Sequence, residues 1–530
     1  MSSLFDDDDP DLSEVPPDEG TASPPALRIV PPAQKQALPT AGQLERGAGS
    51  LSDAKVAEYV TRDVLTGQYC WSAGLGWMEW DGTRWRRCSD VAVTEPVRTY
   101  IIGMVAKRLP EVADDAQARG ALTGLLNRGR ISAAVSLARG LVQVSDEAFD
   151  THPDLLNTPT GVVDLATGAL RPHDPELYLT KITSVGYVPG ADHVDWNAAL
   201  QSIPKECREW FQVRTGQAIT GHMTPDDAMV LMQGGGENGK STVMNALMAA
   251  AGDYHVLVSD RVLTASPDAH PTELMDFRGA RLAVSEELPE GRRLSVKRVK
   301  DTVGTPRMKA RYIRQDTVEW EATHSLFLST NYLPVVEETD HGTWRRLLLL
   351  KFPYKFLKPH QSPSGPTELP GDAGLRRRVE KGKRQQQAVL AWLVEGAGRW
   401  YAADQVMPEP PDQVEQNTRA WRADSDLILG YWSERIEPDH DSHIMSADLF
   451  EDFTTWLRSR GHQQWSDKTL VARFGGHDET QRWKVERKKV RRKMGDIGLS
   501  RPPVAGSGWE ARPTPQTSYQ AWVGLRFTGS

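Results

Sequence analysis

The stretch LMQGGGENGKSTVMNAL (residues 231–247) decides the fold expected for this chain. It begins inside an apolar run, AMVLMQ (228–233), that is typical of a buried strand, and it ends in residues that favour a helix. Between them lies a complete match to the pattern G-x-x-x-x-G-K-[ST]. Glycines lack Cβ atoms, so backbone N–H groups can wrap a phosphate chain, and a helix N-terminus adds partial positive charge. The stretch therefore predicts a nucleoside-triphosphate site.

Each part of the pattern has a predicted role. Lys240 is expected to reach the β- and γ-phosphates, Ser241 to bind Mg²⁺, and Thr242 to assist through its hydroxyl. ATP and Mg²⁺ are the cofactors that such a site implies. A glycine-rich turn without a ligand is the alternative, and the strand before it and the helix after it favour the site. The predicted nucleotide-binding set is Gly234, Gly235, Gly236, Glu237, Asn238, Gly239, Lys240, Ser241 and Thr242.

Two further apolar runs end in polar side chains. RLAVSEE (281–287) ends in Glu286 and Glu287, and SLFLSTN (325–331) ends in Asn331. Hydrolysis needs one group near magnesium and another near the attacking water. We assign Glu286 to magnesium, although the sequence leaves the division of roles between the two glutamates open. Asn331 is expected to orient the water or sense the γ-phosphate; solvated glutamates and an ordinary turn asparagine are the alternatives.

Basic residues stand at two other places near these strands. HGTWRRLLLLKF (341–352) places Arg345 and Arg346 before an apolar run, where either could be offered to the γ-phosphate of a neighbouring subunit, with surface ion pairing as the alternative. From residue 307 basic and apolar residues alternate, with Lys309 and Arg311 facing one way, and VEWEA (318–322) returns. This pattern predicts a basic β-hairpin that could touch the backbone of single-stranded DNA. A solvated edge hairpin protected by its charge is the alternative.

Composition limits the class of protein. The chain has 530 residues and a net charge of −8, but eight of its 71 acidic residues lie in the first 20 positions, which leaves 63 acidic against 63 basic residues elsewhere. Any nucleic-acid surface must therefore come from local clustering. The cysteines, Cys70, Cys88 and Cys207, show no metal-binding spacing. No apolar stretch approaches the roughly 18 residues of a membrane span, and the N-terminus is acidic, so we expect a cytoplasmic protein without a membrane partner.

The chain is expected to contain four regions. Residues 1–50, with eight prolines and few bulky apolar groups, read as a disordered acidic tail. An α+β domain (51–200) follows, with a hairpin at WDGTRW (80–85), helices over 91–150, and strands around the turn signals at 160–161 and 167–168. From 228 to 356 short apolar strands alternate with helices, which predicts a parallel sheet with crossover helices inside an ATPase domain (201–405). The last region spans residues 425–530.

In this order, the blocks resemble superfamily 3 helicases, and more narrowly the phage and plasmid primase-helicases related to the poxvirus primase-helicase. The resemblance covers roughly residues 55–500. It rests on GGGENGKST (234–242), RLAVSEELPEGRRL (281–294), MKARYIRQD (308–316), LFLSTNYLP (326–334) and TWRRL (343–347), with NTPTGVVDLATGALRPHDPELYLTK (157–181) upstream and QAVLAWLVEGAGRWY (387–401) and PEPPDQVEQNTRAWRADSD (408–426) downstream.

The resemblance implies a P-loop NTPase motor of the AAA+ type that translocates on DNA as an ATP-driven hexamer. It carries Glu286 and Glu287 to the acidic motif, Asn331 to the γ-phosphate sensor, and Arg345 or Arg346 to an arginine acting on the neighbouring subunit. Arg311 and Arg314 map to the DNA hairpin, although Gly304-Thr305-Pro306 replaces the usual Gly-Gly-Asp turn before it. Many relatives carry a primase-polymerase domain before the motor; none is visible here, so we expect no primer synthesis.

Residues 425–530 resemble the winged-helix modules that end such proteins. SADLFEDFTTWLRSRG (446–461) and SDKTLVARFGG (466–476) are the expected first helices, and RWKVERKKVRRK (482–493), with eight basic residues and one acidic residue, is expected to be a DNA-contacting helix. The leading hypothesis is a phage or plasmid replication helicase that forms a ring on single-stranded or forked DNA and meets host or phage replication proteins. A bifunctional primase-helicase, and a DNA-binding initiator that uses ATP only for assembly, are the alternatives.

Overall fold

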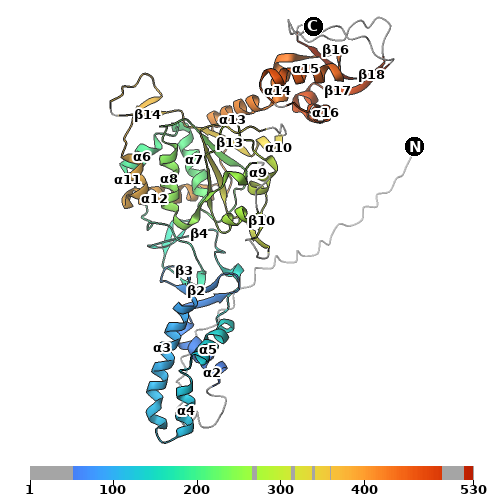
Figure 1. Cartoon of the computed structure of the whole chain (residues 1–530). Coiled ribbons are helices and arrows are strands. Elements are labelled where there is room, and N and C mark those ends of the chain that lie inside the picture. Colours follow the sequence, from blue (N-terminus) through green and yellow to red (C-terminus); the bar gives the residue numbers. More distant parts are fainter. Residues whose placement is uncertain are drawn as a thin grey trace, which may run out of the picture. The chain divides into compact units, whose positions relative to one another are not determined.

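The computed structural model describes residues 52–264, 271–311, 317–336, 341–358, 360–462, 464–491 and 518–528 (Figure 1). The tail predicted for residues 1–50 lies outside these ranges, and so does Arg314. The described residues form two compact units. One combines residues up to Thr66 with Ser89–Gln143, and the other combines Gly67–Cys88 with the chain from Val144 onward.

The first unit is helical, as predicted for residues 91–150. Apolar side chains at helical spacing on the longest helix, among them Val93, Val97 and Ile101, are buried. Ser89 caps this helix by accepting a hydrogen bond from the backbone N–H of Ala92. The helices are α2 (Asp53–Val60), which continues as a π-helical turn (Thr61–Leu65), α3 (Asp90–Arg108), α4 (Ala116–Gly124) and α5 (Arg128–Leu141). No helix among the described residues combines the length and the apolar character needed to cross a membrane.

Two small antiparallel sheets begin the second unit, and they confirm the predicted hairpin and the two predicted turns. Asp81 stabilises the first turn, because its Oδ1 accepts hydrogen bonds from the backbone N–H groups of Thr83 and Arg84. The first sheet contains β1 (Tyr69–Ser72), β2 (Gly76–Trp80) and β3 (Trp85–Arg87); the second contains β4 (Leu155–Thr158), β5 (Gly161–Asp164) and β6 (Ala169–Arg171).

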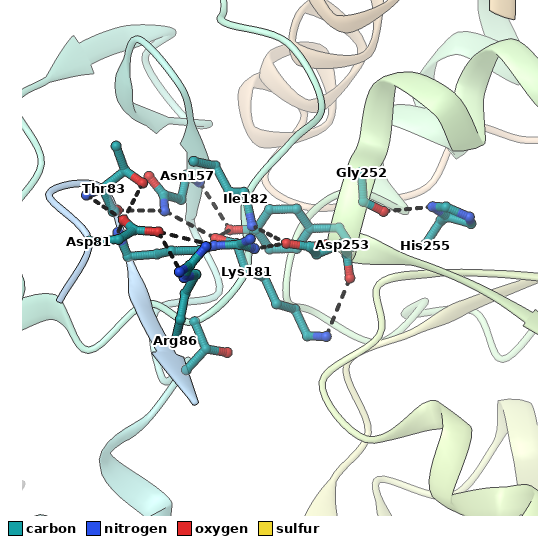
Figure 2. Close-up of polar contacts among 12 residues, drawn as sticks. Asp81, Thr83, Arg86, Asn157, Lys181, Ile182, Gly252, Asp253 and His255 are labelled. Atoms are coloured by element: carbon teal, nitrogen blue, oxygen red, sulfur yellow. Dashed lines mark hydrogen bonds and ion pairs between the residues drawn. The ribbon is translucent and has the colours of Figure 1, made fainter. Parts of the chain in front are cut away.

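A polar network ties these sheets to the short turn Gly252–Tyr254 (Figure 2). Asn157 is fully buried, and its Nδ2 donates to the carbonyl oxygens of Thr83 at 2.9 Å and Lys181 at 3.1 Å. Arg84 pairs with Asp253, whose carboxylate also accepts a hydrogen bond from the N–H of Ile182 at 3.2 Å. One amide side chain therefore joins the β2–β3 turn to the segment around Lys181.

We expect Asn157→Asp to destabilise the protein more than Asn157→Ala. Alanine removes the Asn157 donor from two partly buried carbonyl groups, of which that of Lys181 keeps a hydrogen bond from the Tyr254 hydroxyl at 3.3 Å. The free energy of unfolding should therefore fall by about 1–2 kcal/mol. Aspartate would in addition bury carboxylate oxygens against those carbonyl oxygens, at a further cost. Chemical denaturation would measure both changes. Asn197→Ala, at an exposed position, is the matched control and should shift stability by less than about 0.5 kcal/mol. Equal stability of the aspartate and alanine variants would contradict the network.

The predicted parallel sheet is present. Its order is β13-β7-β12-β9-β8, and all neighbouring strands are parallel. Successive residues of a strand point to opposite faces, and both faces are buried, which explains the continuous apolar runs. The strands are β7 (Met229–Gln233), β8 (His255–Val258), β9 (Leu282–Glu286), β12 (Ser325–Thr330) and β13 (Leu347–Lys351).

Helices cover both faces of this sheet (Figure 1). Val230 and Met232 of β7 pack with side chains of α6, α7, α8 and α12, whereas Met229 and Leu231 pack with α9 and with Trp421 of α13. The structure is therefore an α/β fold with a parallel sheet flanked by helices. The helices are α6 (Val194–Leu200), α7 (Arg208–Gln217), α8 (Lys240–Ala251), α9 (Val296–Val303), α10 (His341–Trp344), α11 (Leu375–Lys381), α12 (Lys383–Ala402) and α13 (Asp412–Ser425).

A buried histidine lies directly before β12. His324 is 1% exposed, its ring packs at a tilt of 42° against that of Phe277 with the centroids 4.3 Å apart, and its Nε2 contacts the carbonyl oxygen of Thr302 at 3.0 Å. Burial lowers its pKa to about 4, from the ordinary value of about 6.5. The unfolded chain therefore binds a proton that the folded chain does not bind between these two pH values.

From this difference we expect stability to fall as the pH is lowered. Below about pH 6.5 the free energy of unfolding should drop by up to about 1.4 kcal/mol per pH unit from this group, until the pH reaches the folded pKa. His324→Gln keeps an N–H donor but does not titrate. Its free energy of unfolding, measured by denaturation from pH 7 to pH 5, should fall less steeply than that of the wild type. Parallel pH profiles would contradict the assignment.

The chain from α14 onward has its own apolar core, built from Tyr431, Phe453, Phe474, Trp522 and their neighbours. The predicted helices over 446–461 and 466–476 are present as α15 and α16. The elements are α14 (Leu427–Arg435), β16 (Ile436–Met445), α15 (Ser446–Ser459), α16 (Asp467–Gly476), α17 (Asp478–Arg482), β17 (Glu486–Arg491) and β18 (Ser518–Phe527), with strand order β16-β18-β17.

The helix predicted for residues 482–493 is wrong. Residues Glu486–Arg491 form β17, which pairs antiparallel with β18 from Glu486↔Val523 to Arg491↔Ser518. Lysine, arginine and glutamate favour helices in isolation, but this segment has no apolar stripe with which a helix could pack. Pairing with β18, whose Ala521 and Trp522 are buried, satisfies its backbone instead.

Candidate nucleotide-binding site

The glycine-rich loop lies where the sequence predicted it, between the end of β7 and the start of α8. Gly239 has φ = 81°, and a Cβ there would lie 2.6 Å from Cβ of Ser202, so this position requires glycine. A Cβ on Gly234 would collide with the side chain of Asn238. Gly235 and Gly236 are different, because they are exposed and a Cβ on either would meet nothing within 4 Å. Folding alone therefore explains two of these glycines, and the surface above Gly235 and Gly236 is open to a ligand.

Lys240 is the first residue of α8, and two oxygen atoms of the β12 end hold its side chain. Its side chain is buried, with 3% of the residue exposed, and Nζ donates to the carbonyl oxygen of Thr330 at 2.8 Å and to Oδ1 of Asn331 at 3.1 Å. Burial lowers the pKa of Lys240, and the carboxylates of Glu287 and Glu286 oppose that shift. The lysine is therefore oriented toward the sheet edge that carries these acidic residues.

A buried donor at the loop fits an anion. Asn238 is 6% exposed, and its Oδ1 accepts from the backbone N–H of Lys240 at 3.2 Å, while its Nδ2 finds no hydrogen-bond partner within the described part of the chain. Burying an unpaired amide donor costs free energy. A phosphate oxygen at the loop would supply the missing acceptor, so this donor set fits a bound phosphate group.

The two glutamates and Asn331 share an edge of the sheet with the loop. β12 lies between β7 and β9, and the carboxyl ends of parallel strands meet at one edge. Glu286 ends β9, and the N–H of Glu287 donates to the carbonyl oxygen of Ser329 on β12 at 2.8 Å. Both glutamates and Asn331 are exposed. The structure thus brings Lys240, Asn331 and the glutamate pair together.

The candidate magnesium ligands are all oxygen donors. Ser241, in the first turn of α8, and Glu286 are both exposed. Among the residues described, no group of three or more histidine, cysteine, aspartate or glutamate side chains is placed to hold a metal ion. Mg²⁺ usually takes only one or two protein ligands together with substrate phosphates and water, so a hydroxyl and a carboxylate fit this ion better than an ion that needs an all-protein site.

The predicted arginines lie at the opposite edge of the sheet. Arg345 and Arg346 precede β13, and both approach Oδ2 of Asp227, which precedes β7. Arg346 is largely buried and also donates to the carbonyl oxygen of Gly342 at 2.6 Å. The Arg345 side chain is 50% exposed, and its contact with Asp227 is longer, at 3.4 Å. The structure therefore does not bring these arginines to the phosphate loop of their own chain.

The predicted basic hairpin is present as β10 (Arg307–Ala310) and β11 (Val318–Glu321), which pair antiparallel. As expected, Met308 and Ala310 are buried while Lys309 and Arg311 are exposed. Lys309 Nζ lies 3.0 Å from a carboxylate oxygen of Glu319 on the returning strand. DNA binding by Lys309 and Arg311 stays a prediction, and Arg314 lies outside the described residues.

Two contacts of this site were missed by sequence reasoning. Asp227, which orders both arginines, lies in a turn (TPDDAM, 224–229) whose acidic pair gave no hint of a partner more than a hundred residues away. Phe356 lies beside the loop, and its ring edge is 3.1 Å from the place where Cβ of Gly239 would be. No local pattern marks this residue, because its position depends on how the chain leaves β13.

Comparison with known proteins supports the resemblance. Residues 58–211 match the family model described as "D5 N terminal like". The chain is 26% identical over 338 residues to "Putative primase C962R" of African swine fever virus, which covers 59% of this chain and 34% of that protein. It is 24% identical over 263 residues to "Putative helicase 022R" of Frog virus 3, covering 48% and 27%, and 22% identical over 299 residues to "Uncoating factor OPG117" of Monkeypox virus, covering 53% and 36%.

The chain thus spans about a third of the length of these curated relatives. Among solved structures, the C-terminal region of NrS-1 superposes with a TM-score of 0.43 and 9% identity, covering 86% of this chain and 95% of that one, which is too loose a likeness to support an inference. The D5-like match at residues 58–211 and the relatives named above agree with each other. Over the matched residues the chain is similar to the D5-like primase-helicases.

Proposed function

We propose that this chain is an ATP-dependent DNA helicase that serves phage or plasmid replication and hydrolyses ATP at the subunit interfaces of a ring. The observation that carries the proposal is the split of the predicted groups between two edges of one sheet. Lys240, Asn331 and the glutamate pair gather at the carboxyl edge, while the arginines lie at the amino edge. A chain with this arrangement needs an arginine from a neighbour to complete its site. The names of the relatives, which include primases and helicases, also support a role in DNA replication.

The residues divide the work of hydrolysis as follows. The loop N–H groups, Asn238 Nδ2 and Lys240 hold the phosphates, and Lys240 shifts from its contacts with Thr330 and Asn331 onto the β- and γ-phosphates. That shift frees the side chain of Asn331 to orient the attacking water, and Glu287 accepts the water's proton. Ser241 and Glu286 would hold Mg²⁺, which would neutralise charge on the phosphates.

The exposures of the two arginines favour Arg345 as the residue that acts on the neighbouring subunit. A side chain that is half exposed, with one long contact, can be withdrawn from Asp227 at little cost. Arg346 is largely buried and makes two hydrogen bonds within its own chain, so it orders the turn before β13. We assign Arg345 as the arginine finger and Arg346 as its support.

DNA is the proposed partner of the two basic surfaces. The β10–β11 hairpin presents Lys309 and Arg311, and β17 carries three consecutive exposed basic residues, Arg487, Lys488 and Lys489. Such surfaces bind phosphates with little sequence preference and with strong salt dependence. The winged-helix assignment for residues 425–530 belongs to this proposal, and the three-stranded sheet with helices α14 to α17 supports it.

Strand displacement on a forked duplex tests the proposal. Purified protein with ATP and Mg²⁺ should release the displaced strand, and omission of ATP should stop the release. ATP-dependent binding to DNA without displacement would favour the initiator that uses ATP only for assembly. Incorporation of ribonucleotides on a single-stranded template would favour the primase-helicase instead.

A further inference from the structure

The segment that leaves β13 borders the phosphate loop along its length. The N–H of Phe352 donates to the carbonyl oxygen of Gln233 at 2.8 Å, and the N–H of Phe356 donates to that of Glu237 at 2.7 Å. Lys358 Nζ lies 3.6 Å from Oε1 of the same glutamate. The strand β14 (Lys355–Leu357) therefore forms one side of the loop, opposite the side that Lys240 shares with Asn331.

The order of the sheet tells which end of a nucleotide faces this strand. Asn331 and the glutamates follow β12 and β9, on one side of β7, and they mark the γ-phosphate end of the site. The chain of a bound triphosphate runs from that end across the start of α8. The nucleoside therefore lies toward the other neighbour of β7, which is β13 and the segment that follows it.

An aromatic side chain lies at the expected nucleoside end of the site. Phe356 is partly exposed, and its Cε2 lies 3.1 Å from the place of a Cβ on Gly239, the residue directly before α8. Ser202 approaches the same glycine from elsewhere in the chain. Aromatic rings stack on every nucleobase because each base has a π-face.

We propose that β14 is the nucleoside wall of the site, with Phe356 stacking on the base, and this inference rests on the proposed nucleotide binding. The backbone hydrogen bond from Phe356 to Glu237 fixes the wall to the loop before a nucleotide arrives, whereas the exposed ion pair between Lys358 and Glu237 adds little. On its other side β14 pairs with β15 (Glu368–Pro370), and the N–H of Gly371 donates to the carbonyl oxygen of Leu357 at 2.9 Å. The wall is thus a two-stranded element that is held at both of its edges.

Equilibrium binding of a fluorescent ADP analogue to the full chain tests the wall without turnover. Phe356→Ala should weaken binding roughly tenfold, the size expected for loss of one base stack, and Phe356→Trp should restore it. In ATP hydrolysis the alanine variant should raise KM by a similar factor and leave kcat within about twofold, since the stack is present before and during the reaction. Phe356→Leu keeps apolar bulk without an aromatic face, so weak binding by this variant would exclude a folding defect as the cause.

Lys358→Ala should change nucleotide binding by less than about twofold, because its exposed ion pair with Glu237 contributes little and the backbone hydrogen bond from Phe356 to Glu237 remains. Lys355→Ala is the matched control: it removes an exposed lysine from the same strand and should bind as the wild type does. Wild-type affinity in Phe356→Ala, while the parent chain binds nucleotide, would overturn the wall alone. A parent chain that binds nucleotide but unwinds nothing would refute the helicase and leave the wall standing, and a parent chain that binds none would refute both.

Discussion

Lys240→Ala is expected to abolish ATP hydrolysis, lowering kcat at least about 100-fold, the usual scale for removing one group that stabilises transition-state charge. The wild-type Nζ already lies at the edge where the γ-phosphate would sit, held by Thr330 and Asn331. Alanine removes the only charge that the loop itself directs there. Phosphate release in the presence of Mg-ATP, with and without single-stranded DNA, would measure the loss.

Lys240→Arg should lose almost as much ATP hydrolysis as Lys240→Ala. Lys240 is 3% exposed, and the larger planar guanidinium does not fit a space shaped for a single ammonium group between two oxygen atoms. Lys355→Ala, which removes an exposed lysine from β14, should hydrolyse ATP as the wild type does. Thermal melting of all three variants would separate lost chemistry from lost folding. Full turnover by Lys240→Ala would show that this loop is not the nucleotide site.

The part of this site that the sequence predicted is the part that local chemistry determines. A strand, a glycine loop and a helix start lie within 231–247, and the polar residues Glu286, Glu287 and Asn331 each end an apolar run. Because parallel strands share their carboxyl edge, the position of each polar residue in its own strand was enough to bring the three together. The basic hairpin could be predicted as well, because the alternation of basic and apolar residues along a strand is a local signal.

What the sequence could not predict depends on partners that are distant along the chain. ERKKVR (486–491) has the composition of a helix and becomes a strand only because β18 pairs with it. Arg346 is oriented by Asp227, and Phe356 is brought to Gly239 by the register of β13 against β7. For residues 486–491 the competing helix preference is worth a few tenths of a kcal/mol per residue, so pairing with β18 overrides it.

Arg345→Ala is expected to lose ATP hydrolysis, whereas Arg346→Ala is expected to lose stability. Arg345→Ala should keep wild-type stability, because a half-exposed contact at 3.4 Å contributes little, but it should lower kcat by about 10³-fold, as expected when an arginine finger is lost. Arg346→Ala should lower the free energy of unfolding by about 1–3 kcal/mol, because the partly buried carbonyl of Gly342 loses its donor and the carboxylate of Asp227 keeps only the longer contact with Arg345. Denaturation and steady-state hydrolysis, run on both variants, would separate these outcomes.

An experiment that mixes two kinds of inactive subunit tests whether the arginine acts across a subunit interface. Arg345→Ala subunits keep Glu287, and Glu287→Gln subunits keep Arg345, so each is inactive alone while a mixed interface can contain both groups. In a head-to-tail ring assembled at random from equal amounts, about a quarter of the interfaces should be complete, with hydrolysis recovering to about that fraction. If hydrolysis recovered instead when Arg346→Ala subunits replaced Arg345→Ala subunits, Arg346 would be the arginine finger. The arginines and the phosphate loop lie at opposite edges of one sheet, so neither arginine can reach the phosphates bound by its own chain. If neither mixture recovered ATP hydrolysis, the arginines could not act across an interface either. That result would refute the proposed interfacial site.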